Sequence, residues 1–217
     1  MSGALASAAV TAGAPTPYPV AARELLRATL LDGMGEQLRA RPWSQVTMAD
    51  VATAAGVSRP TLYKEFGSRR DLARAYVLRE VDRFLGAVEG AVTAHLDDPA
   101  TALAAAFDVF LVAAAEDPLV RAIVSSEDGD ELLPLVTTQG EPVLERATES
   151  LAGLLVRGWP EVGEGDARLL AECVARLAIS FAALPTGPAR MTGTAVASLL
   201  SPYVEQVLAR TRDDEAA

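Results

Sequence analysis

The sequence contains a single cysteine, Cys173, and a single histidine, His95. One cysteine excludes a disulfide within the chain, and such sparing use is typical of proteins that work in a reducing compartment. These two residues also cannot supply the set of His and Cys ligands that a structural zinc site needs. We therefore expect no disulfide, no metal site and a cytoplasmic location.

Two further absences concern membranes and export. The sequence has no run of about 18 apolar residues, the minimum that predicts a membrane-spanning helix. Residues 1–17 carry no charge, whereas a signal peptide begins with a positively charged segment. We therefore predict no membrane partner, and we interpret residues 1–18 as a disordered tail.

The sequence patterns of common enzyme classes are missing as well. Lys64 is the only lysine and follows no glycine-rich loop, so the phosphate-binding pattern Gly-x-x-x-x-Gly-Lys is absent. Residues 163–165 lack the third glycine and the preceding strand of a dinucleotide loop. No Ser or Cys signature of a catalytic triad accompanies His95. We therefore interpret His95 as a residue at the end of a helix, close to Asp97 and Asp98. We predict that the chain is not an enzyme and needs no cofactor.

The net charge of −10 is divided unequally along the chain. Residues 18–84 hold 11 basic and 8 acidic side chains, whereas residues 85–217 hold 8 basic and 21 acidic ones. A positive head on an acidic body suits a protein that approaches phosphate with one end only, although acidic charge also keeps a body soluble. The acidic run over residues 127–131 lacks the remaining ligands of a calcium loop, so we expect a solvated loop there.

Residues 47–66 have the pattern of two short helices joined by a tight turn. Thr47, followed three residues later by Asp50, is a capping pattern for the first helix. Ser58 can cap the second helix, and Gly56 supplies the backbone freedom that a sharp turn requires. This spacing predicts a helix-turn-helix, whose second helix lies in the major groove of DNA.

The sequence around this motif resembles the TetR family of one-component transcriptional regulators (TetR/AcrR type). The resemblance rests on Thr47-Met48-Ala49-Asp50-Val51-Ala52, Ala55-Gly56-Val57-Ser58, Thr61-Leu62-Tyr63-x-x-Phe66 and Ser68-x-x-x-Leu72. It implies an all-α fold of about nine helices, with a DNA-binding head over residues 19–84. It also implies a body over residues 85–217 that binds a small molecule and forms a homodimer. Residues 46–85 further resemble an actinobacterial subgroup often associated with alkane or fatty-acid metabolism.

The candidate DNA contacts are the polar side chains of the motif and its flanks: Thr47, Ser58, Arg59, Thr61, Tyr63, Lys64 and Arg69. Arg59 can form two hydrogen bonds with a guanine edge, and Thr61 can contact a thymine methyl group. Simpler interpretations stay open: Thr47 and Ser58 can be caps only, and Arg59 can be a solvated charge.

The family resemblance adds roles for three of these residues. It implies that Thr47, Tyr63 and Arg69 contact phosphate, which the free N–H groups at helix N-termini favour. The pair Lys64 and Glu65 departs from the basic or aromatic pair that is common in the family. The resemblance therefore assigns no role to either of them.

Hydrophobic periodicity, together with proline and glycine breaks, predicts the other helices. They are expected over residues 20–39, 68–95, 101–116, 118–125, 141–157, 166–184 and 192–210. Trp43 is predicted to pack the first of them against the helix-turn-helix, with stacking on a base as the alternative. Aromatic residues are only 5% of the chain, so close packing on alanine is expected.

An apolar cavity is expected inside the body. Its candidate lining is almost free of charge: Leu103, Phe107, Phe110, Leu111, Leu151, Leu155, Cys173 and Leu177. Such a lining suits a lipophilic ligand that is held by shape. Ordinary core packing explains the same residues equally well and stays open.

The helix over residues 166–184 carries a row of large and a row of small apolar residues, so it can face its own core and a partner helix. The candidate dimer interface combines the small row with the last helix: Ala171, Ala175, Ala178, Ala182, Leu199 and Tyr203. Burial of both rows within one subunit is the alternative.

Together these features predict a homodimeric regulator that binds a pseudo-palindromic operator in double-stranded DNA. We expect a repressor that is released by an apolar effector such as a fatty acid, an acyl-CoA or a hydrocarbon. The alternative is a helical small-molecule binding protein that does not bind an operator.

Overall fold

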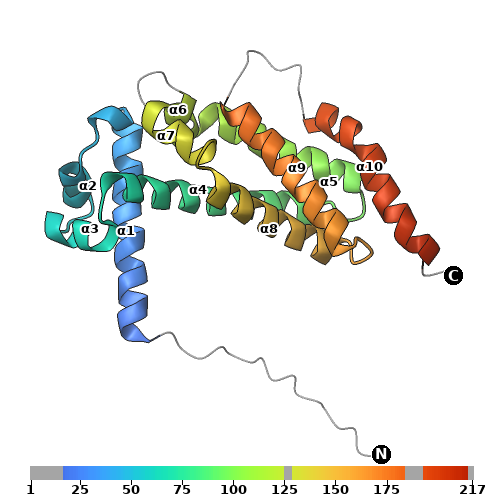
Figure 1. Cartoon of the computed structure of the whole chain (residues 1–217), viewed down its shortest axis with the longest axis horizontal. Helices are drawn as coiled ribbons and strands as arrows, with labels where there is room; N and C mark the ends of the chain where they lie inside the picture. Colours follow the sequence, from blue (N-terminus) through green and yellow to red (C-terminus); the bar gives the residue numbers. More distant parts are fainter. Residues whose placement is uncertain (1–16, 125–128, 184–192, 215–217) are drawn as a thin grey trace, which may run out of the picture.

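Ten α-helices and one short 3-10 helix make up the computed structural model, which describes residues 17–124, 129–183 and 193–214 (Figure 1). No strand occurs among these residues. The helices are α1 (Tyr18–Ala40), the 3-10 helix (Trp43–Gln45), α2 (Met48–Ala54), α3 (Arg59–Phe66), α4 (Arg69–Thr93), α5 (Pro99–Glu116), α6 (Pro118–Val124), α7 (Gly129–Val136), α8 (Glu141–Gly158), α9 (Glu164–Ala183) and α10 (Gly193–Asp214).

The helix that the sequence did not predict is α7, which begins inside the acidic run that we interpreted as a solvated loop. Leu132 and Leu135 are buried on its inner side, at 0% and 4% exposure. Burial of two leucines is worth several kcal/mol, and it outweighs the presence of Pro134 inside the helix. The described residues therefore form ten α-helices, close to the nine or so that the sequence predicted.

The boundary between the N-terminal tail and the first helix also differs from the predicted one. α1 begins at Tyr18, directly after Pro17, so the tail predicted over residues 1–18 overlaps the helix by one residue. Residues 1–16, the greater part of that predicted tail, lie outside the described residues. Pro19 occupies the first turn of α1, where a missing backbone N–H costs no hydrogen bond.

The helix-turn-helix forms through the caps that the sequence predicted. Thr47 Oγ1 accepts a hydrogen bond from the Asp50 amide (3.2 Å), and the Asp50 carboxylate accepts one from the Thr47 amide (2.9 Å). Ser58 caps α3 by accepting from the Thr61 amide. Gly56, in the turn between α2 and α3, has a φ of 67°, a conformation that side chains with a Cβ rarely adopt. The motif is thus defined by local sequence.

The core of the head centres on Trp43, whose side chain is 1% exposed among α1, α2, α3 and the start of α4. This burial confirms the predicted packing role of Trp43 and leaves its ring unavailable for stacking on a base. The same buried cluster continues into α6 and α7 through Leu119, Ile123 and Leu132. Head and body therefore share a core, and the boundary that we predicted at residue 84 lies within α4.

α4 runs from the head through the length of the body (Figure 1). Arg79 fixes α1 against it by donating to the carbonyl oxygens of Ala28 (3.2 Å) and Leu31 (2.9 Å) and to the Asp32 carboxylate (2.8 Å). Arg83 adds a second bond to Asp32 (3.1 Å). α1 and α4 are thus joined by charged hydrogen bonds as well as by apolar packing.

The body is built from α5, α8, α9 and α10 around the second half of α4. α8 packs along α9, and α5 packs along α10 and α4. Trp159, directly after α8, donates from its indole N–H to the carbonyl oxygen of Leu96 (3.0 Å). Arg146 pairs with Asp82 and attaches α8 to α4. None of the described helices is long and apolar enough to cross a membrane.

Candidate nucleic-acid interface and apolar cavities

α3 divides cleanly into a buried and an exposed side. Leu62 and Phe66 are buried, at 0% and 6% exposure, and attach the helix to the head core. Arg59, Tyr63 and Lys64 are exposed, with Tyr63 at 44%. A short exposed helix with two cations and a phenol has the shape and the chemistry that fit a major groove lined by phosphate.

Thr47, Ser58 and Thr61 make local hydrogen bonds at the helix starts. Ser58 Oγ and Thr61 Oγ1 are 2.8 Å apart, and Thr47 Oγ1 donates to Asp50 (2.6 Å). The bonds from the Thr47 side chain and backbone hold the pKa of the Asp50 carboxyl below its usual value. The capping roles are therefore present, and contacts of these residues with DNA stay predictions.

Glu65 gains a role that the sequence did not indicate. Its side chain is 9% exposed and accepts a hydrogen bond from Arg23 Nε (2.9 Å), while Arg27 donates to the Glu65 carbonyl oxygen (2.9 Å). The bond from Arg23 lowers the pKa of the Glu65 carboxyl. Glu65 thus anchors α3 to α1, a contact between residues 42 positions apart that no local pattern reveals.

Arg69 is engaged within the chain. Its Nε donates to the Val46 carbonyl oxygen (3.1 Å), and its other nitrogens bond the Trp43 carbonyl and the Glu131 carboxylate. The guanidinium carbon lies 3.8 Å from the centre of the Trp43 ring. The predicted phosphate contact of Arg69 therefore competes with these internal bonds, and it stays a prediction.

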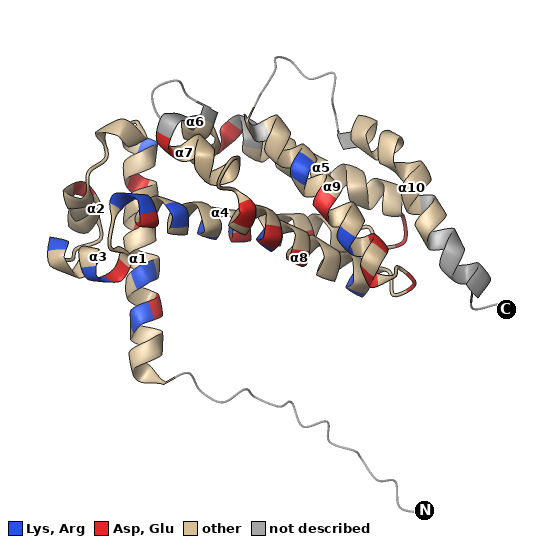
Figure 2. Cartoon of the chain, in the orientation of Figure 1, with Lys and Arg blue, Asp and Glu red and all other residues tan. Residues whose placement is uncertain are grey.

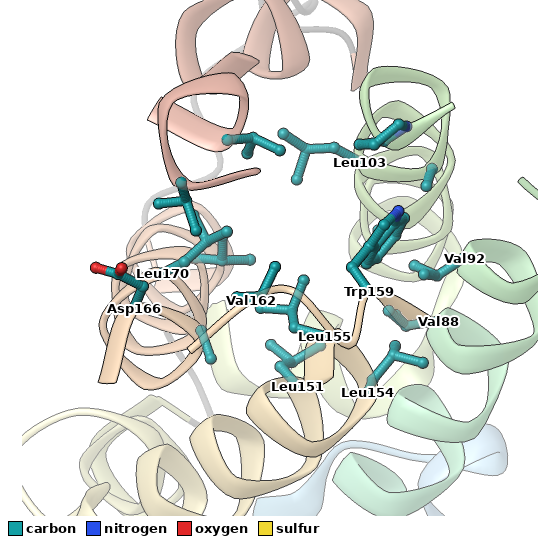
Figure 3. A pocket seen from close by; sticks show the side chains of 17 residues that line it. Val88, Val92, Leu103, Leu151, Leu154, Leu155, Trp159, Val162, Asp166 and Leu170 are labelled. Atoms are coloured by element: carbon teal, nitrogen blue, oxygen red, sulfur yellow. The ribbon is translucent and has the colours of Figure 1, made fainter. Parts of the chain in front are cut away.

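Two apolar cavities lie one behind the other in the body. The distal cavity has a volume of about 80 Å³ and is lined by residues such as Leu103, Leu155 and Trp159 (Figure 3). The proximal cavity, about 180 Å³, reaches α6 and α7 beside the head and is lined by residues such as Phe107 and Phe110. Val88, Ala106, Leu151 and Val174 line both cavities and form the wall between them.

Carboxylates are the ionisable groups among the described lining residues. Asp166 lies at the edge of the distal cavity (Figure 3). Its Oδ1 accepts a hydrogen bond from the Tyr203 hydroxyl at 3.2 Å. Glu80 and Asp117 line the proximal cavity. The rest of both linings is apolar apart from the Trp159 indole N–H, which is bonded to Leu96. The arrangement can hold an uncharged aliphatic chain.

Five of the eight residues predicted for the cavity line one of these two spaces: Leu103, Phe107, Phe110, Leu151 and Leu155. Leu111 lines neither of them. Cys173 and Leu177 are exposed, Leu177 at 37%, so their assignment to the lining is wrong. α9 faces inward with Ala171 and Ala175, and a step of two residues turns about 200° around a helix.

The same orientation corrects the predicted dimer interface. Ala171 and Ala175 are buried within the subunit, at 0% and 3% exposure, where α9 packs on α8. Ala178 lines the proximal cavity, and the side chain of Ala182 lies outside the described residues. Within this chain Tyr203 bonds Asp166. Ala171, Ala175 and Ala178 therefore face the inside of the subunit, which was the alternative left open.

Other apolar side chains of α9 and α10 are exposed. Leu169 (53% exposed), Cys173 and Leu177 (37%) follow one another at four-residue spacing along α9. Leu199 on α10 is 73% exposed. We call these four residues the outer apolar row. Such a row on a helix surface is typical of a site where another chain packs.

Charge is distributed as the sequence predicted, with Lys and Arg along α1, α3 and the first turns of α4 (Figure 2). Acidic residues stand along the middle of α4 and on α8 and α9 (Figure 2). No group of three or more His, Cys, Asp or Glu side chains in the described part of the chain is placed to hold a metal ion.

Comparison with known proteins agrees with this architecture. Residues 30–76 match the family of bacterial regulatory proteins of the TetR family. Residues 98–202 match a C-terminal domain of the bacterial tetracyclin repressor. A chain of Mycobacterium tuberculosis, the HTH-type transcriptional regulator AlkX, is 36% identical over 190 residues, which cover 88% of this chain and 90% of that protein.

More distant and structural relatives extend the comparison. The HTH-type transcriptional activator FasR of Mycolicibacterium smegmatis is 27% identical over 168 residues, covering 77% of this chain and 72% of FasR. The crystal structure of AlkX from Dietzia sp., a TetR family repressor implicated in biodegradation of n-alkanes, superposes with a TM-score of 0.76. It is 39% identical, and the match covers 84% of this chain and 96% of that one.

The matched relatives are transcriptional regulators and not enzymes. Regulators of this family bind operator DNA and act as dimers. The helix-turn-helix, the exposed face of α3 and the helical body with its cavities are the parts that such a protein needs. The chain belongs to the TetR family of DNA-binding transcriptional regulators.

Proposed function

We propose that this regulator is a repressor, that it binds a pseudo-palindromic operator as a homodimer, and that an apolar small molecule releases it. The observation that carries the proposal is the pair of adjoining apolar cavities in the same chain as an exposed recognition helix. The Dietzia relative, a repressor implicated in biodegradation of n-alkanes, supports this class of effector. A protein that reads chromosomal DNA acts in the cytoplasm.

In this proposal the exposed side of α3 reads the operator. Arg59, at the first position of α3, bonds a guanine edge, and Thr61 contacts a thymine methyl group. Tyr63, Lys64 and the start of α2 at Thr47 contact phosphate. Arg23 and Glu65 hold α3 at a fixed angle to α1, so the reading side chains approach the groove as one unit.

The outer apolar row is the proposed dimer interface. Leu169, Cys173 and Leu177 lie on one side of α9, and Leu199 is exposed on α10. Packing two copies through these helices buries leucines that one subunit leaves in water, at about 25 cal/mol for each Å² of apolar surface. The interface replaces the buried alanine row that the sequence suggested.

The effector is proposed to be an aliphatic chain without a negative charge inside the cavities. Each CH₂ group that it buries contributes about 0.8 kcal/mol. Glu80 is paired with Arg79 and Arg83, but the carboxylates of Asp117 and Asp166 would repel a buried fatty-acid carboxylate. A hydrocarbon or a fatty alcohol therefore fits better than a fatty acid or an acyl-CoA, whose charged end would have to remain outside.

A single set of titrations tests the proposal. An operator is first selected from random duplex DNA by the purified protein, and its binding is followed by fluorescence anisotropy. Hydrocarbons, alcohols, fatty acids and acyl-CoAs of equal chain length are then added. We expect release by the uncharged chains at lower concentrations than by the acids. Failure to select any sequence would instead favour a small-molecule binding protein without operator binding.

A further inference from the structure

One carboxylate of the body holds the connection between the first two helices of the head. Oε2 of Glu131, on α7, accepts a 2.7 Å hydrogen bond from the indole N–H of Trp43. The same oxygen accepts from the guanidinium of Arg69. Because Arg69 also bonds the carbonyl oxygens of Trp43 and Val46, the three residues join α7, the α1–α2 connection and the start of α4.

The opposite side of α7 borders the proximal cavity. Val136, at the end of α7, lines that cavity together with Leu119 and Ile123 of α6. Leu132 and Val136 belong to the buried cluster that also contains Trp43. α7 therefore stands between the cavity and the head, with apolar contacts on one side and the Glu131 carboxylate on the other.

The short connection from α7 to α8 restricts how α7 can respond to a ligand. A Cβ atom at Gly140 would lie 2.4 Å from the Val136 carbonyl oxygen, so this turn is closed too tightly for any side chain. Val143, just after the turn, also lines the proximal cavity. A ligand chain in the cavity would therefore contact α7 through Val136 and would also contact Val143, on the other side of the same short turn.

We propose that Glu131 is the residue through which the proximal cavity sets the position of the DNA-reading head, an inference that rests on the function proposed above. With the cavity empty, Glu131 holds Trp43 and Arg69 and thereby fixes the α1–α2 connection against α4. A ligand that displaces α6 and α7 withdraws the carboxylate and frees the head to change its angle. Glu131 touches neither DNA nor ligand and acts as a positioning residue.

Loss of the Glu131 bonds should change two affinities in opposite directions. The bonds of Glu131 stabilise the DNA-binding conformation relative to the ligand-binding one. Removing them shifts the equilibrium toward the ligand-binding conformation, so operator affinity falls and ligand affinity rises together. General damage to the head would lower operator affinity without improving ligand binding. Glu131 is 61% exposed at its side chain, so its replacement leaves no large void in the core.

The test compares Glu131→Gln and Glu131→Ala with the parent protein, using dodecane, 1-dodecanol and dodecanoic acid as probes. We expect Glu131→Ala to bind the selected operator about tenfold more weakly and the effective probe about tenfold more tightly, a typical size for coupling between sites. Glu131→Gln keeps an acceptor for Trp43 but loses the charge that faces Arg69, so it should fall between. The control Glu145→Ala removes an exposed charge from α8 and should change neither affinity.

A second measurement follows the hydrogen bond directly. Nitrogen-15 NMR of the parent protein shows two indole N–H signals, from Trp43 and Trp159, and Trp159→Phe assigns them. Saturation with the effective probe should shift the Trp43 signal toward its position in Glu131→Ala. An unmoved Trp43 signal, or a Glu131→Ala protein whose probe affinity equals that of the parent, overturns the role of Glu131 while the proposed function stands. A parent that binds operator but is released by none of the three probes overturns both.

Discussion

Arg23 Nε donates a 2.9 Å hydrogen bond to the Glu65 carboxylate and so joins the first helix to the DNA-facing helix. Arg27 adds a bond to the Glu65 backbone from the next turn of α1. Since Arg79 and Arg83 attach α1 to α4, a chain of charged hydrogen bonds runs from α3 through α1 to the long helix of the body. The angle of α3 is thereby linked to the position of α4.

Glu65→Gln should weaken this link in a pH-dependent way. The pKa of Glu65 is lowered by Arg23, so the carboxylate adds stability above the pKa of the unfolded chain, and this gain is lost as pH falls through the lower folded value. We expect the variant to be less stable at pH 7 by only about 1 kcal/mol, because solvent screens the charge of Arg23, which is largely exposed. The difference in unfolding free energy between the two proteins should narrow as the pH falls below 4.5, the usual pKa of glutamate.

Urea unfolding of both proteins at pH 7 and pH 4 measures this difference. Glu149→Gln, an exposed glutamate of α8, serves as the matched control and should show no such pH dependence. Equal unfolding midpoints for Glu65→Gln and the parent at pH 7 would mean that the bond between Arg23 and Glu65 contributes nothing to stability.

Arg59→Ala tests base reading. Loss of a bidentate contact with guanine should cost about 1–3 kcal/mol for the selected operator and little for scrambled DNA. Fluorescence anisotropy at several salt concentrations separates this loss from a loss of phosphate contacts, which would also flatten the salt dependence. Arg157→Ala, on α8 and paired with Glu89, is the control for removal of one arginine. If Arg59→Ala lowers the affinity for the selected operator and for scrambled DNA equally, then Arg59 contacts the phosphate backbone of DNA and not a base.

Local sequence was sufficient for the helix-turn-helix because its signals act within a few residues. The capping box of Thr47 and Asp50, the cap of Ser58 and the positive φ of Gly56 are all set by neighbours in the chain. The bond from Trp43 to Glu131 joins residues 88 positions apart. No periodicity or motif records such a partner, so the internal engagement of Arg69 and the role of α7 required the structure.

α9 shows a second limit of sequence reasoning. Its two rows of large and small apolar residues predicted that the helix has two packed sides, but periodicity does not say which side meets which partner. The small side chains of Ala171 and Ala175 let α8 approach closely within the subunit. This leaves Leu169 and Leu177 outside, so Cys173 and Leu177, which were predicted to line the cavity, are exposed instead.

Replacing Leu169 and Leu177 by Glu should therefore separate the dimer. The two leucines are 53% and 37% exposed, so the charges are well solvated in a monomer but would be buried in the proposed interface. We expect monomers of parent-like helicity that bind the operator weakly, because both half-sites are needed. Light scattering and circular dichroism measure this. Val112→Glu, at a 57% exposed site on α5, is the control, and a double variant that stays dimeric would place the interface elsewhere.

Leu151→Phe should act as a length filter, because Leu151 lines both cavities and stands in the wall between them. A long aliphatic chain must displace this side chain to occupy both spaces, whereas a short chain can remain in the proximal cavity of about 180 Å³. That volume is close to the 150 Å³ or so that accommodates benzene. Exchanging the isobutyl side chain of Leu151 for the larger benzyl side chain of Phe costs a ligand that crosses the wall about 1–3 kcal/mol in strain. We expect release of operator by 1-hexadecanol to weaken at least fivefold and release by 1-hexanol to change little, as measured by anisotropy.

Leu111→Phe enlarges a residue of α5 that lines neither cavity and should leave both responses unchanged. If Leu151→Phe weakens the two alcohols equally, then Leu151 does not divide a continuous site into a short and a long part.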